Sequence, residues 1–585
     1  MVKRVSAVTL QMRVSAIGSS RGVKRGNAAH PFGLRLSRLL GNGTSVGAGV
    51  FTLDAPTADI DMHNEKSQIQ NSADAQKTES VWMDISMPSF RALDDDLEVD
   101  VVIVGAGLTG ITAAYMLSRE GVKVALIDRG PIAGVDTSRT TAHLTYVTDS
   151  RLHELVAKFG ADAARAFWEA GGAAIDEIDR IVREHRIECD FRWTSGYLHE
   201  SLRKEPDPKE LARLKRDAEL ARELGFDATL VASVPYAHRV GVRFDQQAKF
   251  HPRKYLRALL PLIEERGGLI FEDTAFEAVE SEPLAVSANG KRIRCDYLMI
   301  ASHNPLMGRL GTLAAAAFQT KLSLYTSYVL GARLPRDTLP EALYWDTSDP
   351  YDYLRVDTNA DGQYAIFGGD DVKTGQEKDT HAVFRKLTER FRSVLPMAAA
   401  PEHRWMGQVV ETDDGMPFIG ENAPRQFVAT GFCGNGFTLG TLAAMMIRDR
   451  ILDRPNPWST LLDTGRLPFH GGVWRYVREN LDYPYYMVRD RLARAESGSI
   501  DDLASEEGRI LKVDGRKVAA YRDAAGTVTL LSPVCTHLGC IVRWNRADRT
   551  WDCPCHGSRF HPAGEVLSGP AEKALERVSR SQSGS

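Results

Sequence analysis

A glycine turn between two apolar segments restricts the fold of this chain more than any other sequence feature. Residues 101–104 predict a buried strand, residues 108–120 predict a helix, and residues 123–127 predict a second strand. The turn that joins the first strand to the helix reads G-x-G-x-x-G and is formed by Gly105, Gly107 and Gly110. Strand, turn, helix and strand in this order predict a βαβ unit and therefore an α/β fold with a parallel sheet.

The turn carries the residue types that bind a dinucleotide. Gly105 permits the tight bend, Gly107 lets the backbone approach a pyrophosphate, and Gly110 allows the helix to pack closely on the strand. The N-terminus of the helix favours the negative charge of that pyrophosphate. Asp128, which closes the second strand, would accept hydrogen bonds from a ribose and so disfavours NADP. The turn alone does not distinguish NAD from FAD.

Residues near the C-terminal end have the composition of a metal site. Four of the seven cysteines lie close together with two histidines, and the set is Cys535, His537, Cys540, Cys553, Cys555 and His556. Two cysteines and two histidines can also close a tetrahedral zinc site, which is the alternative interpretation. Zinc ligation leaves Gly539, Pro554, Gly557 and the second pair of cysteines unexplained.

These residues resemble a Rieske iron-sulfur domain, in which two thiolates bind one iron of a 2Fe-2S cluster and two imidazoles bind the other. The resemblance implies that Cys535 and Cys553 share one iron and that His537 and His556 share the other. It also implies that the remaining pair forms a disulfide, Cys540 with Cys555, as in the cytochrome bc complex type. Short strands expected at 509–513, 517–522 and 527–531 predict a small all-β domain.

Segments outside the Rieske-like region resemble the D-amino-acid oxidase and glycine oxidase type of FAD-dependent oxidoreductase. They are residues 101–128, Gly134 with Ser138, residues 412–420 and residues 431–438, within about residues 98–450. The resemblance implies FAD as the cofactor, a Rossmann-like FAD-binding fold with an antiparallel-sheet substrate domain, and Ser138 among the cofactor-binding residues. It also implies that the late glycine segment lines the isoalloxazine ring, with Gly434, Asn435, Gly436 and Phe437. Glycines there admit close backbone approach, and a helix starting near Thr438 would favour negative charge on a reduced flavin.

The catalytic residues are less marked in the sequence. Enzymes of this type take a hydride from an amine carbon and need side chains that place the substrate, often an Arg or Tyr that holds a carboxylate. Arg355, Tyr325 and Tyr328 are the candidates for this role. His303, which follows an apolar strand, is expected to be structural rather than a proton acceptor.

The two resemblances, together with composition at the N-terminus and in the connector, suggest four regions. Residues 1–90 are expected to be a basic, disordered N-terminal extension; residues 1–53 resemble a transit peptide, or the chain starts at Met62 or Met83. Residues 91–455 are the FAD-dependent oxidoreductase domain and residues 501–585 the Rieske domain. Residues 456–500 are rich in aromatic side chains, so we expect this connector to pack on a neighbouring domain.

Charge and hydropathy exclude several partners. With 73 Lys and Arg against 77 Asp and Glu, nothing points to nucleic acid. The long weakly polar stretch 306–324 contains Arg309 and Lys321, so no spanning membrane segment is expected.

We expect a cytoplasmic protein with a small-molecule substrate and a redox partner that is a protein or a quinone. A disulfide would be unusual in reducing cytosol unless it is buried.

A flavin accepts two electrons and a 2Fe-2S cluster passes one, so their presence in one chain predicts a dehydrogenase rather than an oxidase. The resemblance implies that the substrate is an amine or amino acid. Electrons would leave the flavin through the Rieske cluster to an acceptor. Two alternatives stay open. In the first, the chain is a reductase: an external donor feeds electrons to the cluster, and the flavin reduces a substrate. In the second, the chain is a non-enzymatic redox sensor whose flavin pocket is empty. The intact glycine segments argue against an empty pocket.

Overall fold

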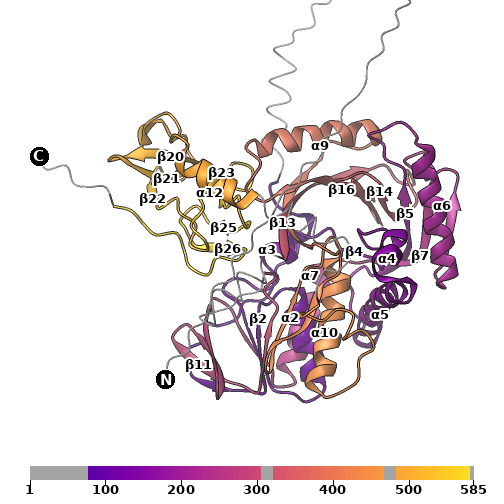
Figure 1. Cartoon of the computed structure of the whole chain (residues 1–585), viewed down its shortest axis with the longest axis horizontal. Helices are drawn as coiled ribbons and strands as arrows, with labels where there is room; N and C mark the ends of the chain where they lie inside the picture. The colour runs from indigo at the N-terminus through magenta and orange to yellow at the C-terminus, as the bar shows by residue number, and fades with distance from the viewer. Residues whose placement is uncertain (1–76, 305–320, 467–481, 580–585) are drawn as a thin grey trace, which may run out of the picture. The chain divides into compact units, whose positions relative to one another are not determined.

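The computed structural model describes residues 77–304, 321–466 and 482–579 (Figure 1). The predicted βαβ unit lies at the centre of a six-stranded sheet. Strand β2 (Val101–Val104) pairs in parallel with β3 (Val124–Ile127) on one side and with β12 (Tyr297–Ile300) on the other. The outer strands are β8 (Leu269–Phe271), β19 (Gln426–Thr430) and the antiparallel β18 (Phe418–Ala423). The Rossmann-like prediction is confirmed.

Both faces of this sheet are covered, which explains why β2 is uninterruptedly apolar. Val101 and Ile103 belong to the core shared with helices α2 (Leu108–Arg119) and α10 (Gly436–Ile451), which lie side by side (Figure 1). Val102 and Val104 alternate to the other face and pack against a second, four-stranded sheet. Its strands are β1 (Leu97–Glu98), β11 (Lys291–Arg294), β10 (Leu284–Ala288) and β9 (Phe276–Ser281).

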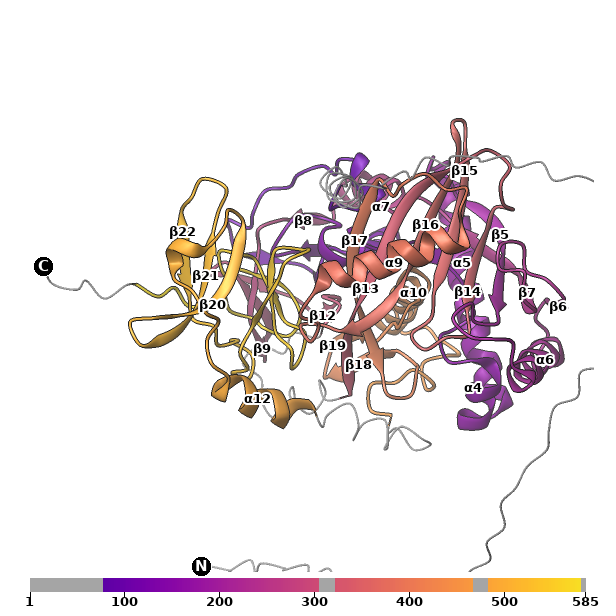
Figure 2. The same ribbon diagram turned by 90° about the horizontal axis from the view of Figure 1, so that it is seen from above.

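The substrate domain is built on a nine-stranded mixed sheet. Its strands in order are β17 (His403–Thr412), β13 (Leu322–Leu334), β16 (Gly362–Lys373), β15 (Tyr353–Asn359), β14 (Ala342–Asp346), β5 (Arg192–His199), β7 (Gly241–Lys249) and β4 (His143–Leu144), with β6 (Ala228–Val231) on β7. All pairings except β14 with β5 are antiparallel, as predicted. Helix α9 (Thr380–Val394) lies along β13 and β16 and covers one face with Phe384, Leu387 and Phe391 (Figure 2).

Four longer helices follow residue 150. They are α4 (Leu152–Phe159), α5 (Ala161–His185), α6 (Pro208–Glu223) and α7 (Pro252–Glu264), preceded by the short α3 (Val135–Ser138). The buried face of α5 carries Phe167, Trp168 and Ile175, at the spacing of an amphipathic helix. None of the helices within the described ranges is long and apolar enough to cross a membrane.

The expected disordered extension is wrong for residues 77–90. The helical turn η1 (Val81–Asp84) places Trp82 in the core, where its indole N–H donates to the carbonyl of Thr140 and its ring packs against His251. The backbone of Lys77 pairs with that of Glu402. A large buried aromatic side chain is enough to anchor a segment whose composition is otherwise polar. The basic residues before position 77 lie outside the described part of the chain.

The C-terminal domain contains two small antiparallel sheets, as predicted. One holds β20 (Glu507–Val513), β21 (Arg516–Arg522) and β22 (Val528–Leu531); the other holds β23 (Arg543–Asn545), β24 (Thr550–Asp552), β25 (Arg559–Phe560) and β26 (Val566–Ser568). The short turn η2 (Ile500–Asp502) precedes them.

The connector contacts both domains where the structure describes it. Trp458 packs on the core of the FAD domain. Helix α12 (Asp482–Leu492) contacts the C-terminal domain, because Asp490 pairs with Arg543 at 2.7 Å and the carbonyls of Asp490 and Arg491 accept from Lys517 at 2.9 Å. Three of the aromatic residues that motivated the packing prediction, Phe469, Trp474 and Tyr476, lie outside the described residues.

Candidate active site

A cavity of about 1580 Å³ joins the features that the sequence singled out. The dinucleotide turn lines it at Gly105 and Gly107, and the late glycine segment lines it at Gly434, Asn435, Gly436 and Phe437. The concave face of the nine-stranded sheet contributes Ser327 and Val329, and the C-terminal domain contributes residues 566–568. The cavity is therefore large enough for a cofactor and a substrate, and it reaches the domain that carries the cysteines.

The glycine turn forms a cradle that side chains would fill. Gly105 has φ +103°, and a Cβ there would lie 2.7 Å from the carbonyl oxygen of Ala301. A Cβ on Gly107 would lie 2.8 Å from Oγ1 of Thr137, and one on Gly110 would lie 1.9 Å from the carbonyl oxygen of Gly105. The turn thus fits a pyrophosphate held by backbone at the start of α2, which is the fit expected for FAD.

Asp128 lines the cavity and also braces the turn. Its two carboxylate oxygens accept hydrogen bonds from the backbone N–H groups of Ala106 at 2.7 Å and Gly130 at 2.9 Å. Burial raises the pKa of Asp128, while these two N–H groups oppose the rise. Its contact with a ribose stays a prediction, consistent with its position on the cavity wall.

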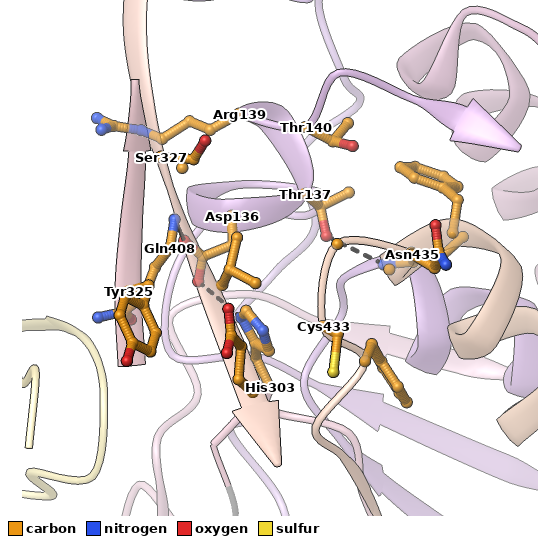
Figure 3. A pocket seen from close by; sticks show the side chains of 18 of the residues that line it. Asp136, Thr137, Arg139, Thr140, His303, Tyr325, Ser327, Gln408, Cys433 and Asn435 are labelled. Atoms are coloured by element: carbon orange, nitrogen blue, oxygen red, sulfur yellow. Dashed lines mark hydrogen bonds and ion pairs between the residues drawn. The ribbon is translucent and has the colours of Figure 1, made fainter. Parts of the chain in front are cut away.

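The late glycine segment lies across the pocket from the sheet (Figure 3). Asn435 is the residue before α10, so this helix begins at Gly436, two residues before the predicted start. The Asn435 amide donates to the carbonyl of Val147 at 3.0 Å, and the Gly434 N–H donates to Asp149 at 3.0 Å. These contacts fix the segment at the N-terminus of α10, and a helix N-terminus stabilises negative charge.

Ser138 does not line the cavity. Its hydroxyl donates to the carbonyl of Val135 at 2.8 Å, whereas its neighbours Thr137 and Arg139 reach the wall. Thr137 Oγ1 accepts from the N–H of Leu108 at 3.2 Å at the start of α2. Among the residues of this short helix, Thr137 is thus better placed than Ser138 to contact a cofactor.

Strand alternation separates the two candidate tyrosines. Tyr325 lines the cavity, but Tyr328 stands three residues further along β13 and so points to the opposite face. There its ring packs edge-on against Phe384 of α9 with centroids 5.1 Å apart. Tyr328 is 1% exposed and does not reach a substrate in the cavity.

Arg355 is a structural residue rather than a substrate-binding one. Its guanidinium donates to the carbonyls of Thr141 (3.0 Å), Ala142 (2.8 Å) and Phe250 (2.9 Å), and to Asp357 at 3.0 Å. It is 2% exposed and is absent from the cavity wall. Arg355 lies on the face of the sheet that lines the cavity elsewhere, but the chain just before β4 covers this face at Arg355.

The predicted cluster ligands come together in the C-terminal domain. The rings of His537 and His556 lie with centroids 4.6 Å apart. The thiol of Cys553 hydrogen-bonds that of Cys535 and lowers the pKa of Cys535 to about 7. Burial lowers the pKa of His537 to about 4 and that of His556 to about 3, so both imidazoles are neutral. Nδ1 of His537 is buried without a hydrogen-bond partner, as expected of an atom that binds a metal.

Cys540 and Cys555 form a disulfide, as predicted. The bridge adjoins the ligand set, because the sulfur atoms of Cys540, Cys555 and Cys553 lie within 4.8 Å of one another. Cys540 is 1% exposed, so burial restricts access of external thiols to its sulfur.

A buried glutamine connects the two cofactor sites. Gln408 of β17 lines the cavity, and its Nε2 donates to the carbonyl oxygen of Gly557 at 2.8 Å, next to the ligand His556. The hydroxyl of Ser568 donates to its Oε1 at 3.1 Å. Its backbone N–H donates to Asp136 at 3.2 Å, and Asp136 contacts His303 at 3.1 Å (Figure 3). A lone glutamine in a strand carries no sequence signal for this role.

Comparison with known proteins agrees with the two regions. Residues 100–450 match the family of FAD dependent oxidoreductases, and residues 495–579 match the Rieske 2Fe-2S domain. The chain is 33% identical over 508 residues to YhfW of Bacillus subtilis, which is named as a Rieske 2Fe-2S iron-sulfur protein; the match covers 86% of this chain and 97% of YhfW.

Two further relatives cover the oxidoreductase region. Gamma-glutamylputrescine oxidoreductase of Escherichia coli is 24% identical, over 69% of this chain and 95% of its own length. The crystal structure of glycine oxidase from Geobacillus kaustophilus matches in fold with a TM-score of 0.52 and 16% identity, over 63% of this chain and all of that one.

Proposed function

This chain belongs to the family of FAD dependent oxidoreductases and carries a Rieske 2Fe-2S domain, and from this premise we propose that it is a dehydrogenase of an amine or amino acid. Electrons from the substrate reach the Rieske cluster within the same chain and leave it for an external one-electron acceptor. The printed names of relatives that act on amines or amino acids, gamma-glutamylputrescine oxidoreductase and glycine oxidase, support the substrate class.

FAD supplies hydride acceptance and a 2Fe-2S cluster supplies one-electron transfer when they are bound. The chain supplies their placement. The backbone around Gly105 and Gly107 would hold the pyrophosphate, and the segment 434–437 would lie against the flavin ring. Cys535, Cys553, His537 and His556 would hold the cluster.

The hydrogen bond from Gln408 to Gly557 carries the proposal. A residue on the wall of the flavin cavity is bonded directly to the loop that holds an iron ligand. Two further contacts tie the two domains together: the ion pair of Arg139 with Asp548, which Arg559 of the Rieske domain also holds, and the N–H of Ala547 donating to the hydroxyl of Thr380 at 3.2 Å. This arrangement supports transfer within one chain rather than between separate molecules.

Anaerobic titration of the purified chain with a library of amines and amino acids tests the proposal. We expect one compound to bleach the flavin absorbance and then to produce the electron paramagnetic resonance signal of a reduced 2Fe-2S cluster. Bleaching without that signal would show that the cluster is not on the electron path. If only a reduced donor protein or dithionite reduces the flavin, and does so through the cluster, the chain is a reductase instead. A cytoplasmic location stays a prediction.

A further inference from the structure

The wall of the cavity is strongly acidic. Eleven Asp or Glu side chains line it against four Lys or Arg, and the basic ones are Arg129, Arg139, Arg151 and Lys158. Bound FAD adds the negative charge of its pyrophosphate to this total. A cavity of this sign favours a positively charged ligand and opposes an anionic one.

A β-bulge places one of these acids beside the sheet face of the cavity. Ser327 of β13 stands opposite two residues of β16, because Thr326 pairs with Val372 and Tyr328 pairs with Gly369. Asp370, the extra residue, has φ +55° and turns to Arg390 at 2.8 Å, on the side of α9. Asp371 therefore returns to the cavity face, which it lines. Bulges commonly re-aim a side chain in this way next to an active site.

Asp371 has an unused acceptor. Its Oδ1 is buried and has no hydrogen-bond partner. The group is next to Ser327, whose hydroxyl also contacts the hydroxyl of Tyr353 at 2.9 Å. Burial, together with the charge of nearby Asp149, raises the pKa of Asp371 to about 7, although the hydrogen bond with Ser327 opposes the rise. A buried carboxylate oxygen that faces a cavity without a partner costs free energy unless a ligand satisfies it.

Asp149 connects this acidic pair to the flavin end of the cavity. It accepts from the N–H of Gly434 at 3.0 Å and from the hydroxyl of Tyr351 at 3.1 Å. The rings of Tyr351 and Tyr353 lie with centroids 5.9 Å apart, and both line the cavity together with Trp345. Carboxylates combined with aromatic rings are the usual surroundings of a bound organic cation.

Two of the four basic side chains of the described wall already have carboxylate partners within the protein. Arg139 already pairs with Asp548, and Arg151 pairs with Glu210 and Asp217. His143 is neutral at pH 7, because burial lowers its pKa to about 3. Arg355, the residue expected to hold a carboxylate, is covered by backbone carbonyls, as described above.

We propose that the substrate is an organic cation, an amine without a carboxylate on the carbon to be oxidised, and that Asp371 and Asp149 with Tyr351 and Tyr353 bind its ammonium group. This inference rests on the proposed function and narrows its substrate class. The ammonium would donate to the free Oδ1 of Asp371 and lie close to the segment 434–437, so that the adjacent carbon faces the flavin.

Binding of tetramethylammonium tests the cation site without requiring turnover. This cation has no N–H bond and no lone pair, so it binds without being oxidised, and its affinity for the FAD-loaded full chain is measured by calorimetry and by the shift of the flavin absorbance. We expect Asp371→Asn to weaken binding at least tenfold. Asp370→Asn, its neighbour on the other face of the sheet, is the matched control and should leave the affinity unchanged. Equal affinities in the wild type and Asp371→Asn, with FAD content preserved, would overturn the proposal, and so would absence of binding to the wild type.

Matched pairs of compounds separate this inference from the proposed function. We expect phenethylamine or 1,4-diaminobutane to bleach the flavin faster than phenylalanine or ornithine, which differ by one carboxylate. Faster bleaching by the amino acids would keep the dehydrogenase and overturn the cation site. Failure of every amine and amino acid to bleach the flavin, while tetramethylammonium binds, would overturn the proposed dehydrogenase and leave the cation site standing.

Discussion

The side-chain amide of Gln408 donates a 2.8 Å hydrogen bond to the carbonyl oxygen of Gly557, which follows the predicted cluster ligand His556 in the chain. Gln408 is 4% exposed, and a Cβ on Gly557 would lie 3.1 Å from its Nε2 and 2.8 Å from Cβ of Leu324. The glycine, with φ +66°, thus allows the ligand loop to press directly on the sheet of the FAD domain.

Gln408→Leu should loosen this contact without removing either cofactor. The carbonyl of Gly557 would be buried without a donor, which costs about 1–3 kcal/mol and so lowers the equilibrium constant for docking of the two domains roughly fivefold or more. We expect slower reduction of the cluster after flavin reduction, measured by stopped-flow absorbance. Gln363→Leu removes another buried glutamine whose bonds, to Leu339 and Thr358, lie away from the interface. If both variants slow the transfer equally, Gln408 has no specific part in it.

The sequence predicted those helices and strands whose burial pattern is uniform along the whole element. Val101 to Val104 are buried on both faces, so their apolar run identified a parallel strand. The site was predicted where backbone or ligand chemistry demands particular residue types, as at Gly110 or His537. The prediction was wrong where a contact between distant parts of the chain decides the outcome. Trp82 anchors a segment that is otherwise polar, and the guanidinium of Arg355 is taken up by the backbone carbonyls of residues 141, 142 and 250.

Asp371 and Gln408 could not have been found from the sequence. The one-residue bulge that turns Asp371 to the cavity depends on the pairing of β13 with β16, strands that are some 40 residues apart along the chain. Tyr325 and Tyr328 were both predicted to bind the substrate. They are three residues apart, so once the segment is known to be a strand, their side chains must point to opposite faces of the sheet.

A chain that ends at residue 455, the expected domain boundary, should be too short to form a stable FAD domain. Arg466 donates to both oxygens of the buried Asp414, at 2.8 and 2.9 Å, and its guanidinium lies 4.0 Å from the centre of the Phe418 ring. A chain ended after residue 455 leaves Asp414 without its counter-ion, which costs about 3–5 kcal/mol. We expect a lower Tm and weaker FAD retention than in a chain ended after Arg466. Equal melting temperatures for the two chains would contradict this.

His537→Ala should remove the cluster and keep the flavin. The imidazole is one of the predicted iron ligands, and it contributes nothing to the dinucleotide turn. Iron and acid-labile sulfide should fall to background while FAD stays near one per chain. His561→Ala is the control, since this exposed histidine of the same domain contacts Glu565 rather than the ligand set. Zinc in place of iron in the wild-type protein would refute the Rieske assignment of these ligands.

Cation binding should depend on pH with a midpoint near 7. The pKa of Asp371 is raised to about 7, so its carboxylate is ionised above that value and protonated below it. The affinity for tetramethylammonium, which does not titrate, should be full above about pH 8 and fall roughly tenfold per unit below about pH 6. Other titratable groups that interact electrostatically with Asp371 are Asp149, Tyr351 and Tyr353 on its own side, and Asp352 and Asp370, which pair with Arg390 on the side of α9. Asp371→Asn should flatten the profile; a profile that keeps its midpoint in this variant would assign the titration to one of those neighbours.

Phe560→Tyr should raise the reduction potential of the cluster. In the family that the ligand loops resemble, a Ser and a Tyr after the second ligand pair donate hydrogen bonds to sulfur, and such bonds stabilise the more negative, reduced cluster. Ser558 keeps the first donor, because its hydroxyl hydrogen-bonds the thiol of Cys535. Phe560 stands at the position of the second, is fully buried, and packs in the same core as Cys535, Cys540 and Cys553. One donor is therefore missing, and the oxidised cluster is favoured, as suits a centre that exchanges electrons with a flavin.

A restored hydrogen bond to a charged acceptor, worth about 1.5–3 kcal/mol, would raise the potential by up to roughly 65–130 mV for one electron. Redox titration followed by electron paramagnetic resonance measures the midpoint, and an unchanged or lower value with the cluster intact would show that this ring does not face the cluster sulfurs.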